Sequence, residues 1–205
     1  MRHFYPIALL MFILSLQSCA SGYTVSDVST RSYVSNDSTA GVTLNYKYNI
    51  LTKKYAKKER KKEIKVLAVK IENHSDTFYT VGRNLNVQNG SGFEYSLLDS
   101  EMAFSTLKQK PATYLFYLLL TPLNLQTIEN KNGFQEAKNI FPIGLILGPA
   151  ITGGNMIVAG SANKKFKADL ESNNVLGKTI KPGETLDGLL IINSATFESL
   201  RLKLK

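Results

Sequence analysis

The sequence predicts a mainly β fold: a β-sandwich over residues 42–205 that carries a helical, apolar insertion at about 99–172. Three observations support this fold class. Apolar and polar residues alternate close to both ends of the range, which is the pattern of strands buried on one face. The middle of the range has helical spacing and two long apolar stretches instead. The chain of 205 residues is also long enough to bury one sizeable core.

The predicted strands are short runs rich in β-branched, aromatic and other apolar residues, bounded by turn residues. They are residues 42–50, 64–71, 78–87 and 93–98 before the insertion, and 186–193 and 197–204 after it. The turn before the last two strands is Lys181-Pro182-Gly183-Glu184, where proline presets φ and glycine takes the strained position. We expect the final two strands to form a hairpin.

The insertion begins with a predicted helix over 100–110, capped by Asp99 or Ser100 and ended by Pro111. Two apolar stretches follow, 114–125 and 140–160, with a polar linker between them. Residues 161–172 are again expected to be helical.

The apolar stretches leave three placements open. They can pack against the sandwich as a helical lid or second layer, or form a hydrophobic patch that contacts membrane or a partner protein. They can also span a bilayer as a hairpin, because 140–160 is close to the length required. Pro142 and Pro149 disfavour a spanning helix, and Gly144 and Gly148 have the small-xxx-small spacing of closely packed helices.

The N-terminal residues 1–18 are typical of a targeting segment, with a positive start and an apolar run over 6–16. They lead into Leu16-Gln17-Ser18-Cys19, which resembles the lipobox of bacterial lipoproteins, although Gln17 stands where a small or β-branched residue is usual. The resemblance implies that Cys19, the one cysteine, becomes the acylated first residue. Two or three acyl chains would anchor the protein stably. The alternative is an ordinary secretory peptide cut after Ala20, which would discard Cys19.

The residues after the cysteine bear on location and on the tether. Ala20 and its non-acidic neighbours imply, by the same resemblance, the outer membrane of a Gram-negative cell and its periplasm-facing leaflet. Residues 19–41 are rich in Ser, Thr, Asp, Asn and Gly, and we expect a flexible tether.

The end of the chain resembles a known architecture. The segment IKPGETLDGLLIIN (180–193), with LRLKL (200–204) and LAVKIEN (67–73), is similar to the immunoglobulin-like domains of many uncharacterised bacterial lipoproteins. The resemblance implies an immunoglobulin-like β-sandwich and no particular activity. The chain has one cysteine and no tryptophan, so the Cys–Trp–Cys core of antibody domains is absent from the sequence.

A basic run over residues 53–65 holds eight Lys or Arg and two Glu, a net charge of +6 in a chain of net charge +9. Like charges would stand at i,i+4 in a helix, so we expect a solvated loop. Either this loop only confers solubility, or it attracts anionic lipid or acidic glycan. The candidate residues for anionic-surface binding are Lys53, Lys54, Lys57, Lys58, Arg60, Lys61, Lys62 and Lys65.

Catalytic chemistry has little support in the sequence. His74 is the one histidine outside residues 1–18, and it stands in a polar turn, so neither a Cys/His pair nor a His-rich metal site is expected. No catalytic residue, metal site or cofactor is predicted, and export excludes nucleic acid. The sequence therefore predicts a non-catalytic binding or structural lipoprotein that has the membrane, and a ligand or protein of the envelope, as partners. The alternatives are a protein whose apolar insertion (114–160) enters a bilayer or docks on an outer-membrane complex, and a hydrolase of envelope polymers.

Overall fold

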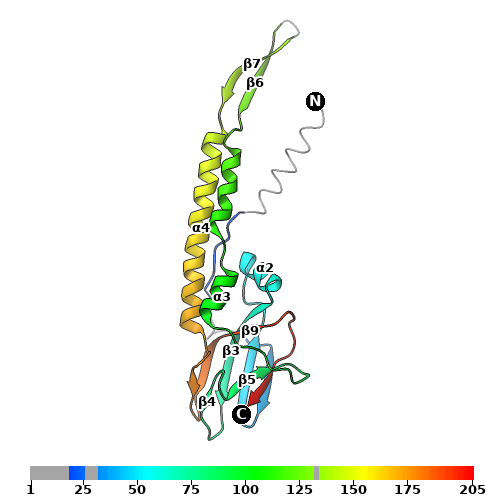
Figure 1. Cartoon of the computed structure of the whole chain (residues 1–205), viewed down its shortest axis with the longest axis vertical. Helices are drawn as coiled ribbons and strands as arrows, with labels where there is room; N and C mark the ends of the chain where they lie inside the picture. The colour runs from blue at the N-terminus through cyan, green and yellow to red at the C-terminus, as the bar shows by residue number, and fades with distance from the viewer. Residues whose placement is uncertain (1–18, 26–31, 132–133) are drawn as a thin grey trace. The chain divides into compact units, whose positions relative to one another are not determined.

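The computed structural model describes residues 19–25, 32–131 and 134–205 (Figure 1). The predicted signal segment lies outside these residues. The chain divides into two compact units. The helical unit comprises the described residues of 19–22 and 109–162, and the sheet unit comprises those of 23–108 and 163–205.

The main sheet of the sheet unit is antiparallel, with strand order β1-β2-β3-β9. These strands are β1 (Ser35–Thr39), β2 (Val42–Lys47), β3 (Ile64–Asn73) and β9 (Thr185–Asn193). β3 and β9 are central and apolar, and Leu67 pairs with Leu190 near the middle of the ladder. Side chains such as Leu44, Val69 and Ile192 are fully buried in the core cluster of this unit.

Shorter strands complete the sheet unit as two-stranded antiparallel pairs. β5 (Leu85–Gln88) pairs with β10 (Arg201–Leu204), and β4 (Tyr79–Thr80) pairs with β8 (Thr179–Ile180). The turn before β9 forms as predicted, with Gly183 at a φ of 78°. The predicted strand 78–87 is split into β4 and β5, and the predicted strand 93–98 makes only isolated bridges.

The sheet unit also contains two short helices. α2 (Lys53–Lys61) forms where a loop was predicted, and α3 (Ser100–Leu107) forms where a helix was predicted. Asp99 caps α3 by accepting a hydrogen bond from the backbone N–H of Met102 at 2.7 Å.

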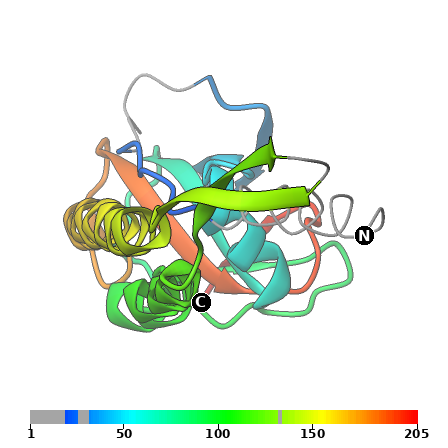
Figure 2. The ribbon, with the colours of Figure 1, turned by 90° about the horizontal axis from the view of Figure 1, so that it is seen from above.

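The helical unit is built from a 3-10 helix, a β-hairpin and the first part of a long α-helix (Figure 1). η1 (Pro111–Leu120) leads into β6 (Leu125–Lys131) and β7 (Phe134–Phe141), which pair antiparallel. α4 (Gly144–Asn173) follows, runs through Pro149, and contributes its residues up to Ala162 to this unit. Seen end on, η1 and this part of α4 lie side by side (Figure 2).

The predicted immunoglobulin-like β-sandwich is wrong. The chain is mixed, with 33% helix and 32% strand in several small antiparallel sheets, and no sandwich is seen in the described residues. The two final strands do not form a hairpin, because β9 pairs with β3 whereas β10 pairs with β5. The linker predicted between the apolar stretches is the hairpin β6–β7. Alternation along one strand shows which face is buried, but it carries no information about the strand's partner.

Candidate functional site

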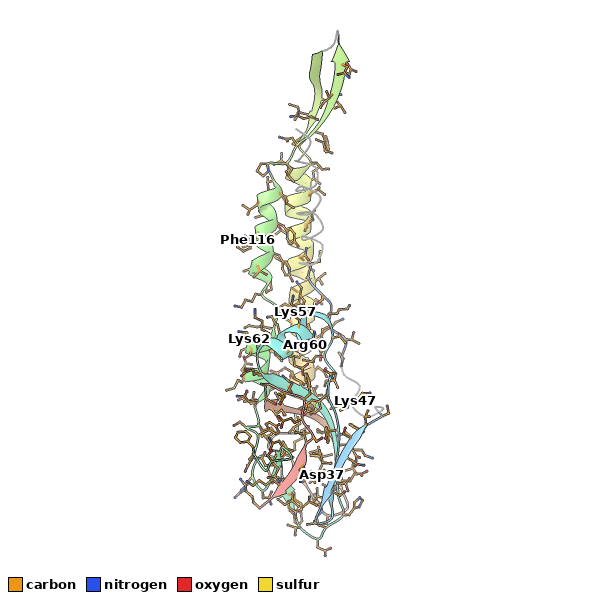
Figure 3. The ribbon with its side chains drawn as sticks, turned by 90° about the vertical axis from the view of Figure 1, so that its right-hand side faces the viewer. Asp37, Lys47, Lys57, Arg60, Lys62 and Phe116 are labelled. Carbon is orange, nitrogen blue, oxygen red and sulfur yellow. The ribbon has the colours of Figure 1, made fainter. Side chains whose placement is uncertain are left out.

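The outside of the helical unit carries large apolar side chains. Phe116 and Leu119 of η1 and Ile157 of α4 are 73%, 75% and 73% exposed. Figure 3 shows Phe116 projecting from η1 on the side away from α4. Nine large apolar side chains of the two helices are exposed: Leu115, Phe116, Leu118, Leu119, Leu145, Ile146, Leu147, Ile157 and Val158.

The contact between η1 and α4 is made by small residues instead. Gly144 lies so close to η1 that a Cβ on it would overlap the carbonyl oxygens of Leu120 and Thr121. Gly148, one turn further along α4, lies against the side-chain hydroxyl of Thr121, 2.9 Å from where a Cβ would stand. The Thr152 hydroxyl donates to the carbonyl of Tyr114 at 3.3 Å. Spacing of four residues puts these three α4 positions on one face, where they let the two backbones approach closely.

The helical unit therefore buries small residues and exposes large apolar ones, the reverse of a water-soluble helix pair. α4 is also the one helix within the described ranges that is long and apolar enough to cross a membrane, judged by length and composition. Only 22% of its most apolar window is buried, whereas the core helix of a soluble protein would be mostly buried. The large apolar side chains of the two helices are therefore not buried as the predicted lid or second layer over 114–160 would require.

Cys19 is exposed, and the residues after it are held on the helical unit. The backbone N–H of Ala20 donates to Oδ1 of Asn155 on α4. Ser21 and the buried Gln109 exchange two hydrogen bonds: Ser21 N–H donates to Gln109 Oε1 at 3.1 Å, and Gln109 Nε2 donates to the Ser21 carbonyl at 2.7 Å. The sequence analysis did not find this role for Asn155 and Gln109, and the one available signal was that Asn155 is a polar residue inside a charge-free stretch.

The predicted tether does not hold along its whole length. Residues 26–31 lie outside the described part, but Tyr23 is buried in the sheet unit. Its ring packs against those of Tyr55 and Phe166, with ring centroids 5.1 and 5.0 Å apart, and its hydroxyl donates to Asp169 at 2.5 Å. Strand β1 (Ser35–Thr39) also lies within the predicted tether. The tether was predicted from a composition poor in aliphatic residues, and that composition gave no sign that one aromatic residue, Tyr23, is buried.

The basic run forms a cationic surface on and next to α2 rather than a loop. Its exposed residues are Lys53, Lys57, Arg60, Lys61 and Lys62, of which Figure 3 labels Lys57, Arg60 and Lys62. Lys54 and Lys58 are half-buried, and the Lys58 ammonium donates to the carbonyl of Lys108. Lys65 is fully buried, so its prediction as a surface-binding residue is wrong.

α2 folds because it has a buried face that the sequence analysis overlooked. Tyr55 and Glu59 stand at i,i+4 and are both buried. The Tyr55 hydroxyl donates to Asn163 at 3.0 Å, and the Glu59 carboxylate accepts the backbone N–H of Val66 at 2.8 Å. Tertiary burial of this face outweighs the like-charge repulsion, which costs only a few tenths of a kcal/mol per exposed pair.

Glu59 and Lys65 are buried ionisable groups next to each other. The ammonium of Lys65 lies 3.5 Å from the backbone carbonyl of Glu59 and 4.8 Å from the centre of the Phe197 ring. Burial raises the pKa of Glu59 to about 7, although the hydrogen bond from Val66 and the charge of Lys65 oppose this. Burial likewise lowers the pKa of Lys65.

A shallow pocket of the sheet unit, about 320 Å³ in volume, is lined by Asn86, Glu94, Tyr95 and their neighbours. Glu94 is the one carboxylate that lines it, and hydrogen bonds from Lys203, Lys205 and Asn86 lower its pKa to about 2. A glycosidase needs two carboxylates, one of them with a raised pKa, and this pocket does not provide them. His74 is exposed, and no group of metal-binding side chains occurs in the part of the chain that the structure describes.

Comparison with known protein families, with curated proteins and with solved structures found no match to this chain. The geometry of the helical unit and of α2 therefore carries the functional interpretation.

Proposed function

We propose that this chain is a non-catalytic lipoprotein of the bacterial cell envelope whose helical unit embeds in a lipid bilayer, and whose sheet unit is held at that bilayer. The observation that carries the proposal is the reversed packing of the helical unit, with Gly144 and Gly148 inside and Phe116, Leu119 and Ile146 outside. Of the functions that the sequence left open, this is the one in which the apolar insertion (114–160) enters a bilayer.

The energetic argument follows from seven of the nine exposed side chains, all except Ile157 and Val158, which lie beyond Asn155 on α4. Full burial of one large apolar side chain contributes about 1.5–3 kcal/mol, and roughly half of that is still available for side chains that are about half exposed. Transfer of seven such side chains into hydrocarbon is thus worth about 5–10 kcal/mol. A free energy of this size in water would instead favour aggregation.

The polar groups of the two helices are compatible with insertion. Apart from Pro149, which has no N–H, the backbone of α4 is hydrogen-bonded within the helix, as a segment in hydrocarbon requires. The sequence is free of charge over 111–128 and 139–163, and charged residues bound both ranges. Thr152, which lies among the small residues, donates to a backbone carbonyl of η1 rather than facing lipid.

Membrane extraction of a variant without the lipid anchor tests the proposal. The Cys19→Ser protein should remain in the membrane pellet after alkaline carbonate treatment, because its apolar helical unit is still inserted. Adding Phe116→Gln and Leu119→Gln should release it. The matched control adds Phe78→Gln and Phe93→Gln, two exposed aromatic residues of the sheet unit, and should stay in the pellet.

Release of the Cys19→Ser protein by carbonate would refute insertion. Retention that depends on one other envelope protein, and disappears in pure lipid vesicles, would favour docking on a membrane complex instead. Circular dichroism of each variant in detergent establishes that the substitutions leave the helices folded.

A further inference from the structure

The position of the lipid anchor on the helical unit is defined by the residues that follow it. Ala20 is hydrogen-bonded to Asn155, in the middle of the part of α4 that belongs to this unit, and Ser21 is hydrogen-bonded to Gln109. Cys19 directly precedes Ala20. An acyl group on Cys19 would therefore leave the protein at the level of Asn155, beside the exposed apolar side chains, rather than at the end of a free tether.

Resting on the proposed function, we infer that the acyl chains of Cys19 and the half of the helical unit between Asn155 and the hairpin enter the same phospholipid leaflet. In this arrangement Asn155 lies at the boundary between headgroups and hydrocarbon. The anchor thereby fixes how deeply the helices insert. The exposed apolar face contacts the lipids of that leaflet and the acyl chains of Cys19.

The length of α4 matches this depth. From Asn155 to Gly144 the helix advances eleven residues, or about 16 Å at a rise of 1.5 Å per residue. One leaflet contributes half of a hydrocarbon core about 30 Å thick, or about 15 Å. The length of this half of the unit therefore matches the hydrocarbon thickness of one leaflet.

The residues on either side of Asn155 agree with this depth of insertion. On the hairpin side of Asn155 lie Leu145, Ile146 and Leu147 of α4, all exposed, and no charged residue occurs before the hairpin strands. On the other side the helix continues through Ser161 to Lys164, where charge returns. Asn155, Ser21 and Gln109 form a polar level between these regions, where an amide side chain can meet headgroups and water.

Cysteine accessibility tests this depth of insertion, because an acylated Cys19 leaves the wild-type chain without a free thiol. Ile157→Cys and Leu147→Cys are introduced separately into the full lipoprotein; both positions are exposed on α4 and lie about 15 Å apart along it. Open envelope fragments are treated with a membrane-impermeant maleimide, with and without detergent. Leu119→Cys serves as a second buried-depth probe on η1.

The expected result is no labelling of the wild type and labelling of Ile157→Cys at least about tenfold faster than of Leu147→Cys or Leu119→Cys, since maleimide reacts with a thiolate that water can reach. Detergent should abolish the difference. Protection of both α4 variants would overturn the placement of Asn155 at the headgroup boundary while leaving insertion intact. Equal, rapid labelling of both would overturn insertion itself, and labelling of the wild type would show that Cys19 carries no acyl group and overturn the inference.

Discussion

Replacement of Glu59 by glutamine should make the sheet unit more stable above neutral pH. The Glu59 side chain is 1% exposed and accepts the backbone N–H of Val66 at 2.8 Å. β2 ends at Lys47, opposite Ala68, so this carboxylate supplies an acceptor to β3 beyond the end of β2. A glutamine has nearly the same shape, and its amide oxygen can accept the same hydrogen bond.

The magnitude follows from the pKa of Glu59, which burial raises from 4.5 to about 7. Between these values the folded protein binds more protons than the unfolded chain, so its stability decreases as the pH rises. The decrease from about pH 5 to about pH 8 amounts to about 2–3 kcal/mol. The amide of the Glu59→Gln variant would resemble the protonated carboxyl, because both are neutral and remove the charge of Glu59 from the neighbourhood of Lys65. The variant should therefore match the wild type near pH 5 and exceed it by this amount near pH 8.

Urea unfolding of the Cys19→Ser chain in mild detergent measures the effect, followed by near-ultraviolet circular dichroism of the packed tyrosines. The quantity of interest is the difference in free energy of unfolding between Glu59→Gln and its parent at each pH, which removes the contribution of all other titrating groups. Glu63→Gln, an exposed position four residues away, should show no such difference. A difference that is independent of pH, or a variant less stable than its parent near pH 8, would refute the reasoning.

Three further changes test other parts of the structure. Gly188→Ala should destabilise the sheet unit by about 1–3 kcal/mol in the same urea assay, because its Cβ would overlap the backbone oxygen of Asn173. Gly144→Ala should loosen the helix pair and increase its proteolysis in detergent, whereas Gly153→Ala, with nothing within 4 Å of the new Cβ, should strengthen α4 by up to about 1 kcal/mol. Lys57→Glu with Arg60→Glu should weaken binding of the Cys19→Ser chain to anionic relative to neutral vesicles at low salt, and an unchanged ratio would exclude α2 as an anionic-surface site.

The local structure of the sheet unit was largely predictable. Period-2 alternation and β-branched residues located β2, β3 and β9, and the Pro-Gly turn located the start of β9. Asp99, the cap of α3, was one of the two cap residues predicted from residue type and position, the other being Ser100. These features are set by neighbouring residues, which is why one sequence is enough to find them.

The features that were missed depend on contacts between distant residues. The like charges of α2 argued against a helix, because its buried face consists of only Tyr55 and Glu59. The partners of these two residues, Asn163 and Val66, lie elsewhere in the sequence. The pairing of β10 with β5 was hidden for the same reason. Sequence neighbours do not specify long-range partners, and tertiary burial overrides local preference where the two disagree.

Whether an apolar helix is buried in protein or faces lipid depends on which of its residues meet the neighbouring helix, not on its composition. In α4 that face is Gly144, Gly148 and Thr152, every fourth residue, whereas the larger residues point outward. A helix of a soluble core would have its large residues on the contact face, because they supply most of the stabilisation by burial in water. In hydrocarbon that gain disappears, and close packing of small residues is what still holds two helices together. The spacing of Gly144 and Gly148, visible in the sequence, thus supports the proposed lipid-facing helix pair only together with two structural findings: η1 lies against these glycines, and Leu145, Ile146 and Leu147 are exposed.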